Sequence, residues 1–453
     1  MNPCFRKESA FMNKRRKFQL IAIASVTGTI LILAVTLFLL FHFVLKDKIN
    51  SFIKKMQEQK APVEETNTQE PQKRETEPEE EIETEAEEET ESYAEPEEET
   101  DPLEQQIRAI LGTMTMDQKI GQLFIVTPEE LTGVDTVTAA GEATQAALAR
   151  YPVGGLLYFS GNIKDPSQLK EMTANTMSYS KELTGLPIFL SIDEEGGEVT
   201  RIASNGRFDV PEFDSMHTIG ETGDPSKAYD VGASIGAYLG EYGINLDFAP
   251  VADVLTNSEN TVVADRSFGS DPKLVSEMAI QVAAGLQDNG VYACMKHFPG
   301  HGATAEDSHN GAAVTQKTWE EMLDADIVPF RDGIIQDIQF LMVAHINAPN
   351  ITGDDTPASL SSIIITEKLR NELGYSGIVV TDGMNMKAIT DQYNSAQAAV
   401  KAIQAGADII LLPEDLETAY QGIREAVADG IITVERIDES LSRILRVKLQ
   451  MTG

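Results

Sequence analysis

The sequence predicts an α/β protein: a single (β/α)8 TIM-type barrel preceded by a transmembrane helix and a disordered acidic linker. From residue 102 onward, eight short apolar runs alternate with amphipathic helical stretches, a pattern typical of a parallel sheet. The stretch 102–453 is long enough for a closed barrel with insertions. A doubly wound open sheet is the alternative.

The predicted transmembrane anchor is residues 18–45, which contain no Lys, Arg, Asp or Glu. About 20 apolar residues span a bilayer as a helix, and no small-residue cleavage site of a signal peptide follows this run. The preceding tail, residues 1–17, is basic, which favours a cytoplasmic N-terminus. Four lysines after the run weaken this asymmetry. We expect a single-pass protein of the cell membrane with an extracytoplasmic barrel.

The charge is distributed unevenly along the chain. Residues 1–57 carry a net charge of +8, residues 58–101 carry −17 and residues 102–453 carry −27. Residues 46–101 comprise a juxtamembrane segment and a Glu/Thr/Pro-rich linker. Residues 58–101 are almost free of large apolar groups, so we expect this linker to be a disordered spacer. The acidic body repels phosphate backbones, which argues against a nucleic-acid partner. Cys4 and Cys294 are too few for a disulfide framework.

The barrel elements follow from apolar periodicity and from proline and glycine punctuation. Three predicted helices begin at a proline, which the first helical turn tolerates. Gly243, Gly290 and Gly406 follow helices where a left-handed end is expected. The predicted strands are 120–126, 154–159, 187–193, 244–254, 291–298, 340–346, 377–382 and 407–413. The predicted helices are 139–150, 166–183, 225–242, 272–289, 318–336, 366–373, 395–405, 417–428 and 434–450.

Polar residues collect at the C-terminal ends of the predicted strands, where barrels carry their chemistry. The densest segment is 296–309, KHFPGHGATAEDSH, which holds three of the six histidines. Histidine titrates near neutral pH and suits proton transfer. The strand-end residues are Asp193, Asp247, Asp253, Lys296, His297, His345 and Asp382.

Three further motifs accompany this loop: SIDEEGGEVTR at 191–201, ADRSFGSDP at 264–272 and VVTDGMNMKAI at 379–389. Taken in chain order with segment 296–309, these motifs resemble those of the glycoside hydrolase family 3 β-N-acetylglucosaminidases of the NagZ type. The resemblance covers about residues 105–450. Glu198 departs from it, because this position in the GGEV sequence often holds arginine.

The resemblance implies a retaining mechanism through a covalent glycosyl-enzyme. Asp382 is the implied nucleophile, His309 the general acid and base, and Asp307 the carboxylate that orients His309. A retaining glycosidase needs a carboxylate near the anomeric carbon and a proton donor to the leaving oxygen, and imidazole can donate and later accept at neutral pH. The implied sugar-binding residues are Asp193, Arg201, Arg266, Lys296 and His297.

No metal and no cofactor is expected. A zinc set could be drawn from His297, His301, Asp307 and His309, but its H-x3-H-x5-D-x-H spacing matches no common zinc pattern. His301 is interpreted mainly as a determinant of loop geometry. Asp253 and His345 are left without a role.

The expected function is an exo-β-N-acetylglucosaminidase that removes non-reducing terminal GlcNAc from peptidoglycan fragments or related glycosides, with no obligate protein partner. One alternative is a glycoside phosphorylase of the same family, because a neutral histidine repels phosphate less than a carboxylate does. A β-glucosidase or β-xylosidase is another. An alternative of a different class is a catalytically silent, tethered wall-sugar-binding protein.

Overall fold

The computed structural model describes residues 101–304, 311 and 313–451. The basic tail, the anchor and all but the last residue of the linker lie outside these residues, and so do Asp307 and His309. Within the described part of the chain, no helix combines the length and the apolar character that a membrane span requires.

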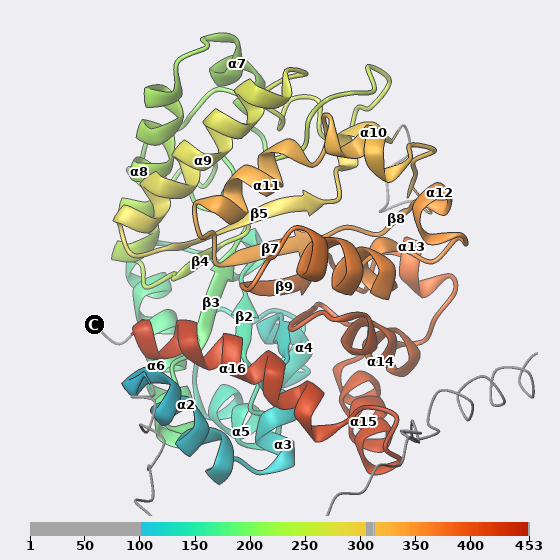
Figure 1. The fold of residues 1–453 in the computed structure, drawn as a ribbon. Helices are drawn as coiled ribbons and strands as arrows, with labels where there is room; N and C mark the ends of the chain where they lie inside the picture. Colours follow the sequence, from blue (N-terminus) through green and yellow to red (C-terminus); the bar gives the residue numbers. More distant parts are fainter. Residues whose placement is uncertain (1–100, 305–310, 312, 452–453) are drawn as a thin grey trace, which may run out of the picture. The chain divides into compact units, whose positions relative to one another are not determined.

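Eight parallel strands form a closed barrel (Figure 1), which confirms the predicted (β/α)8 barrel and excludes the open sheet. The strand order is β10-β1-β2-β3-β4-β5-β7-β9, and a parallel bridge between Val380 and Ile409 joins β9 to β10. The strands are β1 Phe124–Val126, β2 Gly155–Leu157, β3 Phe189–Ile192, β4 Leu246–Asp247, β5 Tyr292–Phe298, β7 Phe340–Val343, β9 Ile378–Thr381 and β10 Ile410–Leu411. An additional parallel pair, β6 Ala313–Val314 with β8 Ile346–Asn347, was not predicted.

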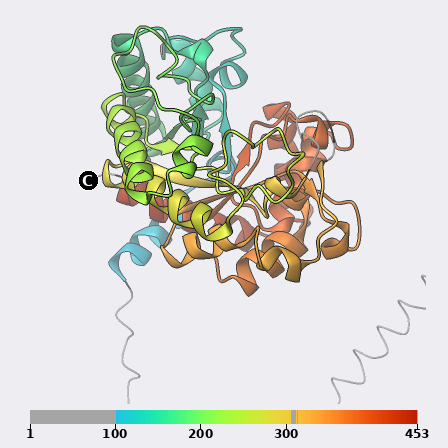
Figure 2. The ribbon, with the colours of Figure 1, turned by 90° about the horizontal axis from the view of Figure 1, so that it is seen from above.

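Helices surround the barrel (Figure 2). They are α2 Pro102–Thr113, α3 Met116–Gly121, α4 Pro128–Thr132, α5 Glu142–Arg150, α6 Pro166–Thr184, α7 Met216–Glu221, α8 Pro225–Glu241, α9 Pro272–Asp288, α10 Trp319–Leu323, α11 Val328–Ile335, α12 Pro349–Thr352, α13 Lys387–Thr390, α14 Ser395–Ala405, α15 Leu416–Ala428 and α16 Val434–Gln450. A π-helix, η4, covers Ile363–Glu372, and short 3-10 turns are η1 Ser160–Asn162, η2 His301–Ala303 and η3 Ala358–Leu360.

The helix boundaries follow local signals. An aspartate caps each of the helices α6, α8 and α9 through its side chain, and a proline follows it in the first turn. Gly243 and Gly290 follow α8 and α9 with φ values of 78° and 77°, as a left-handed helix end requires. The predicted helix 318–336 is divided into α10 and α11, with Pro329 in the first turn of α11. The predicted strand 120–126 begins late, because its first two residues belong to α3.

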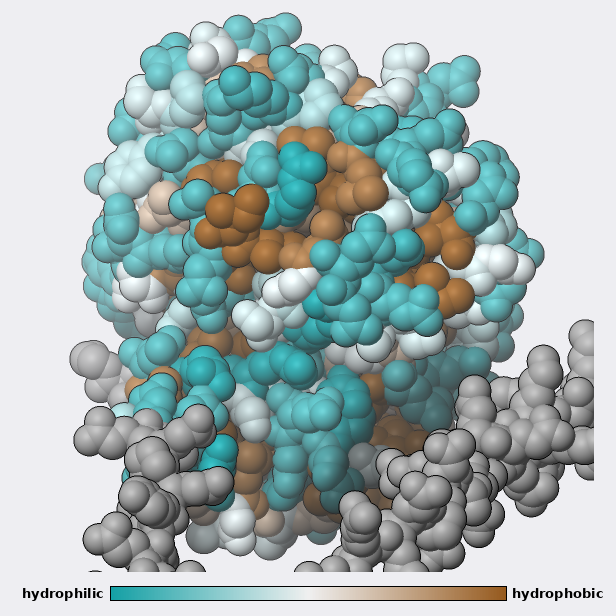
Figure 3. Space-filling model, viewed as in Figure 1, coloured by the Kyte–Doolittle hydropathy of each residue, from teal (hydrophilic) through white to brown (hydrophobic). Residues whose placement is uncertain are grey.

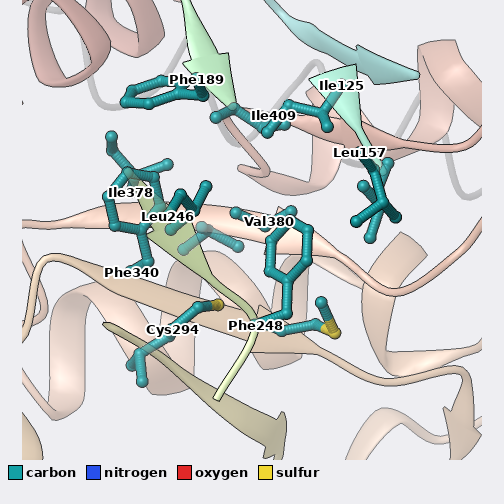
Figure 4. Close-up of a cluster of buried hydrophobic side chains, with 14 of the residues drawn as sticks. Ile125, Leu157, Phe189, Leu246, Phe248, Cys294, Phe340, Ile378, Val380 and Ile409 are labelled. Atoms are coloured by element: carbon teal, nitrogen blue, oxygen red, sulfur yellow. The ribbon is translucent and has the colours of Figure 1, made fainter. Parts of the chain in front are cut away.

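The barrel interior is a packed apolar core and not a channel (Figure 4). The rings of Phe189 and Phe340 meet edge to face, with centroids 5.4 Å apart. Cys294 lies in this core as a free, buried thiol, as its apolar strand predicts. The face drawn in Figure 3 is mostly hydrophilic, with hydrophobic residues gathered near its middle. The rigid interior fixes the strand ends that carry the polar residues.

Candidate active site

The strand-end residues lie where a barrel places its chemistry. Asp193 directly follows β3, and Asp247 ends β4. Lys296 and His297 lie near the C-terminal end of β5, and Asp382 directly follows β9. Because all eight strands are parallel, these C-terminal ends share one rim of the barrel.

Lys296 is the centre of a charged network at this rim. Its Nζ lies 2.8 Å from Asp193 Oδ1 and 2.6 Å from Glu195 Oε1. Arg201 Nη2 lies 3.6 Å from Asp193 Oδ2. Burial would lower the pKa of Lys296, but the carboxylates of Asp193 and Glu195 raise it above its ordinary value. Lys296 is therefore an ammonium at neutral pH.

Glu195 also holds Arg266 in a two-point salt bridge. The Nε–Oε2 and Nη2–Oε1 distances are both 2.7 Å, the geometry of a bidentate pair. Burial opposes the ionised form, yet Lys296 and Arg266 hold the pKa of Glu195 well below its usual range. This one buried carboxylate therefore orients two of the predicted sugar-binding cations.

His297 is oriented by Asp253. Its Nδ1 lies 2.7 Å from Asp253 Oδ2, while Asp253 Oδ1 accepts the backbone N–H of His301 at 2.6 Å. A carboxylate at Nδ1 places a proton on that nitrogen and fixes the ring orientation. Burial raises the pKa of Asp253, but the neighbouring His297 and His301 lower it by more. The pKa of Asp253 therefore lies below its ordinary value.

His301 is buried in the loop after β5. Its backbone carbonyl accepts a hydrogen bond from Asn260 Nδ2 at 2.8 Å, and its Nδ1 lies 3.1 Å from Thr304 Oγ1. These contacts agree with the interpretation of His301 as a determinant of loop geometry. Burial of the ring, together with the nearby His297, lowers the pKa of His301.

Glu194 shapes the segment that carries Arg201. Its carboxylate accepts the backbone N–H groups of Arg201, Ile202 and Ala203 at 2.6 to 3.0 Å. The Glu194 backbone N–H in turn donates to Asp247 Oδ1 at 2.9 Å. Burial raises the pKa of Asp247 well above its ordinary value.

Asp382 stands at the end of β9, half-buried. Its backbone N–H donates to Val343 O at 2.9 Å, and its Oδ1 accepts the backbone N–H of Gly383 at 2.7 Å. His345 Nε2 lies 2.9 Å from Gly383 O, and His345 Nδ1 lies 2.7 Å from Ser359 Oγ. His345 thus contacts the peptide that follows the predicted nucleophile.

The structure brings five of the predicted residues into contacting groups: Asp193, Arg201, Arg266 and Lys296 share one network, and His297 follows Lys296 directly. Asp382 lies at the same rim. Asp307 and His309 lie outside the described residues, so their placement stays a prediction. The sequence interpretation missed Glu195, although it lies within the 191–201 motif, two positions after a strand-end aspartate.

Among the described residues, no group of three or more histidine, cysteine, aspartate or glutamate side chains is arranged to hold a metal ion. Two members of the zinc set drawn from the sequence, Asp307 and His309, lie outside this search. His297 and His301, the other two, use their Nδ1 atoms in the hydrogen bonds given above.

Comparison with known proteins decides the family. The model of the glycosyl hydrolase family 3 N-terminal domain matches residues 115–447. The chain belongs to glycoside hydrolase family 3. Curated relatives are named β-hexosaminidases: LpqI of Mycobacterium tuberculosis is 34% identical over 341 residues, which are 73% of this chain and 82% of LpqI. β-Hexosaminidase A of Pseudoalteromonas piscicida is 32% identical, and the match spans 67% of this chain but only 54% of that protein.

Solved structures of family 3 members agree. A β-N-acetylglucosaminidase of this family from Paenibacillus sp. FPU-7 is 37% identical with a TM-score of 0.70, and the match covers 75% of this chain and 63% of that one. The β-glucoside phosphorylase BglX, with 24% identity and a TM-score of 0.68, shares the fold. The family 3 assignment and its β-N-acetylglucosaminidase group, predicted from the motifs, are confirmed.

Proposed function

We propose that this family 3 protein is a retaining exo-β-N-acetylglucosaminidase that releases non-reducing terminal GlcNAc. The observation that carries the proposal is the ion-paired network of Asp193, Lys296, Glu195 and Arg266 at the same barrel rim as Asp382. Oriented carboxylates and cations of this kind hold a sugar by its hydroxyl groups, because each hydroxyl both donates and accepts hydrogen bonds.

One unmet hydrogen bond supports a polar ligand here. Arg201 Nε is buried and has no hydrogen-bond partner among the described residues. A buried guanidinium N–H without a partner is costly, and a sugar hydroxyl would satisfy it. Arg201 also pairs with Asp193, so a sugar bound there would contact both groups.

The proposed reaction has two balanced steps. In the first, the Asp382 carboxylate bonds to the anomeric carbon while the glycosidic C–O bond breaks, and His309 gives its proton to the leaving oxygen. In the second, water attacks the anomeric carbon, His309 takes the proton of that water, and the bond to Asp382 breaks. Asp307 stabilises the charged imidazolium. The roles of Asp307 and His309 rest on the DSH motif.

The proposed substrates are peptidoglycan fragments or related glycosides that end in β-linked GlcNAc. This choice rests on the apolar segment 18–45 and on the acidic segment 58–101, which together suit a barrel held at a distance from the outer face of the cell membrane. The relatives named β-hexosaminidase support the GlcNAc unit itself.

The test compares the wild-type protein with the Asp382→Ala variant on aryl β-glycosides of GlcNAc, glucose and xylose. We expect turnover of the GlcNAc glycoside by the wild type, and loss of turnover with a retained melting temperature in the variant. Full turnover by Asp382→Ala would refute the mechanism. A preference for glucose or xylose would refute the substrate, and GlcNAc-1-phosphate formed in phosphate buffer would identify a phosphorylase. GlcNAc binding without hydrolysis of any glycoside would identify a binding protein.

A further inference from the structure

His345 and Ser359 connect to Asp382 through one chain of hydrogen bonds. Ser359 Oγ lies 2.7 Å from His345 Nδ1, and His345 Nε2 lies 2.9 Å from Gly383 O. On the other side of this residue, the Gly383 N–H donates to Asp382 Oδ1 at 2.7 Å. The chain therefore ends on the carboxylate to which the nucleophilic role is proposed. None of the proposed sugar-binding or proton-transfer residues belongs to it.

The acceptor at one end determines the tautomer of His345. A backbone carbonyl can only accept a hydrogen bond, so His345 Nε2 must carry a proton and donate it in the hydrogen bond to Gly383 O. In the neutral ring, Nδ1 is then the acceptor of the Ser359 hydroxyl. Both side chains are fully buried, at 0% exposure, so water cannot replace either partner. The ring thus has one orientation in which both nitrogens are satisfied.

The peptides around Gly383 are also fixed from other sides. Gly383 O accepts a second hydrogen bond from Met386 N at 3.1 Å, and Met384 N donates to Leu411 O of β10 at 2.9 Å. These backbone bonds hold the turn in place along β10. His345 is the side chain that ties the same turn to the segment between β7 and β8.

We propose that His345 is a positioning residue for the nucleophile: with Ser359 behind it, it fixes the Gly383 peptide and so directs the Asp382 carboxylate. The proposal rests on the proposed role of Asp382. It predicts a cost in the chemical step more than in sugar affinity, because the hydrogen bonds of His345 lead to Ser359 and to the Gly383 peptide beside the nucleophile. A reacting carboxylate displaced by about 1 Å loses rate on the order of 100-fold.

The experiment measures kcat and KM on an aryl β-GlcNAc substrate for His345→Leu, His345→Gln and Ser359→Ala. Leucine keeps the volume and removes both hydrogen bonds, whereas the glutamine amide can still donate to Gly383 O. We expect kcat of His345→Leu to fall by about 100-fold with KM little changed. His345→Gln should restore much of the loss, and Ser359→Ala should lower kcat by a smaller factor.

Thr176→Val is the matched control. The Thr176 hydroxyl is buried like that of Ser359 and donates to Met172 O at 2.8 Å, but it lies on α6 and is not a member of the hydrogen-bond chain from Ser359 to Asp382. It should lower the melting temperature and leave kcat unchanged. Wild-type kcat in folded His345→Leu would overturn the proposal, and so would kcat losses that only follow the melting temperature across all variants. If His345→Leu does not fold, an unchanged kcat in Ser359→Ala overturns it. Activity retained in Asp382→Ala refutes the proposed function instead.

Discussion

Asp253 serves two partners with its two oxygens: Oδ2 holds His297 Nδ1 at 2.7 Å, and Oδ1 holds the backbone N–H of His301 at 2.6 Å. The second bond matters because it fixes which way the carboxylate is turned. An amide in its place has one oxygen only, and that oxygen must face the N–H of His301. The amide nitrogen would then face His297.

The Asp253→Asn variant is therefore expected to change the tautomer of His297. A donor opposite Nδ1 forces the proton of the neutral ring onto Nε2, which changes what the ring offers to a sugar hydroxyl. We expect KM for an aryl β-GlcNAc substrate to rise about tenfold, the equivalent of about 1.4 kcal/mol of binding. Steady-state kinetics with Asp253→Asn, His297→Ala and the double variant test this. If the two effects simply multiply, the residues do not act together and the explanation is wrong.

Glu195→Gln is expected to weaken both folding and sugar binding. The change leaves Arg266 and Lys296 without their shared buried carboxylate, and breaking a buried pair from one side costs about 3–5 kcal/mol. KM should rise because Arg266 loses its two-point partner and Lys296 keeps only Asp193. Urea unfolding and steady-state kinetics measure the two effects. The exposed pair of Glu417 with Arg150 is the control, and Glu417→Gln should change stability by no more than about 1 kcal/mol.

The ion pairs of Glu195 also predict a pH dependence of stability. Because the folded protein holds the pKa of Glu195 below its ordinary value of 4.5, the carboxylate stabilises the fold fully above that value. The stabilisation declines as the pH falls below 4.5 towards the folded pKa. The difference in melting temperature between wild type and Glu195→Gln should be constant from about pH 5 to 8 and shrink below that range. A difference that grows on acidification would contradict the assignment.

Sequence patterns predicted the barrel because its signals are local. Each strand is a short apolar run, and residues such as Pro166 and Gly243 mark helix ends within one turn. The β6–β8 pair was missed because it joins two-residue segments more than thirty positions apart. No local periodicity marks a strand that short. The division of 318–336 into α10 and α11 could have been read from Pro329.

The site was predictable as far as the motifs reached. They named Asp193, Lys296 and Asp382, which the structure places at one rim. The orienting residues were not assigned, since their partners are distant in the chain: Glu195 and Arg266 are 71 positions apart. Asp253 and His297 are 44 apart. A strand-end position indicates that a residue belongs to the rim, but only the register between strands shows which residue it contacts.

Asp408 closes the barrel at the end opposite the site. It is buried just before β10, where its Oδ2 accepts Val379 N of β9 at 2.9 Å and its Oδ1 lies 2.9 Å from Arg443 Nη1 of α16. Arg370 of η4 pairs with the same carboxylate. Asp408→Asn should lower the free energy of unfolding by about 3–5 kcal/mol, measured by urea unfolding, and leave kcat unchanged. A lower kcat at unchanged stability would show that this cluster serves the site.

Lys448 on α16 gives the opposite pH dependence. Its Nζ donates to Gln122 Oε1 at 2.7 Å and to Gly154 O at 2.8 Å, and lies 4.8 Å from the centre of the Phe189 ring. These oxygens and the ring face favour the ammonium, but complete burial dominates and lowers the pKa of Lys448 to about 7. Between that value and 10.5, its ordinary pKa, the unfolded chain binds the proton more tightly than the folded chain does.

Lys448 therefore reduces stability most at and below neutral pH, and its penalty disappears as the pH rises towards 10.5. The Lys448→Met variant has no such group, so the melting temperature of the wild type should rise relative to the variant from about pH 7 to 9.5. Methionine leaves Gln122 Oε1 and Gly154 O without a donor, which costs about 1–3 kcal/mol for each buried acceptor at every pH. That cost separates the melting temperatures of the two proteins at every pH, but it does not change how their difference varies with pH. Parallel curves across this range would mean that Lys448 stays charged in the folded protein, held by its two oxygens and the Phe189 ring.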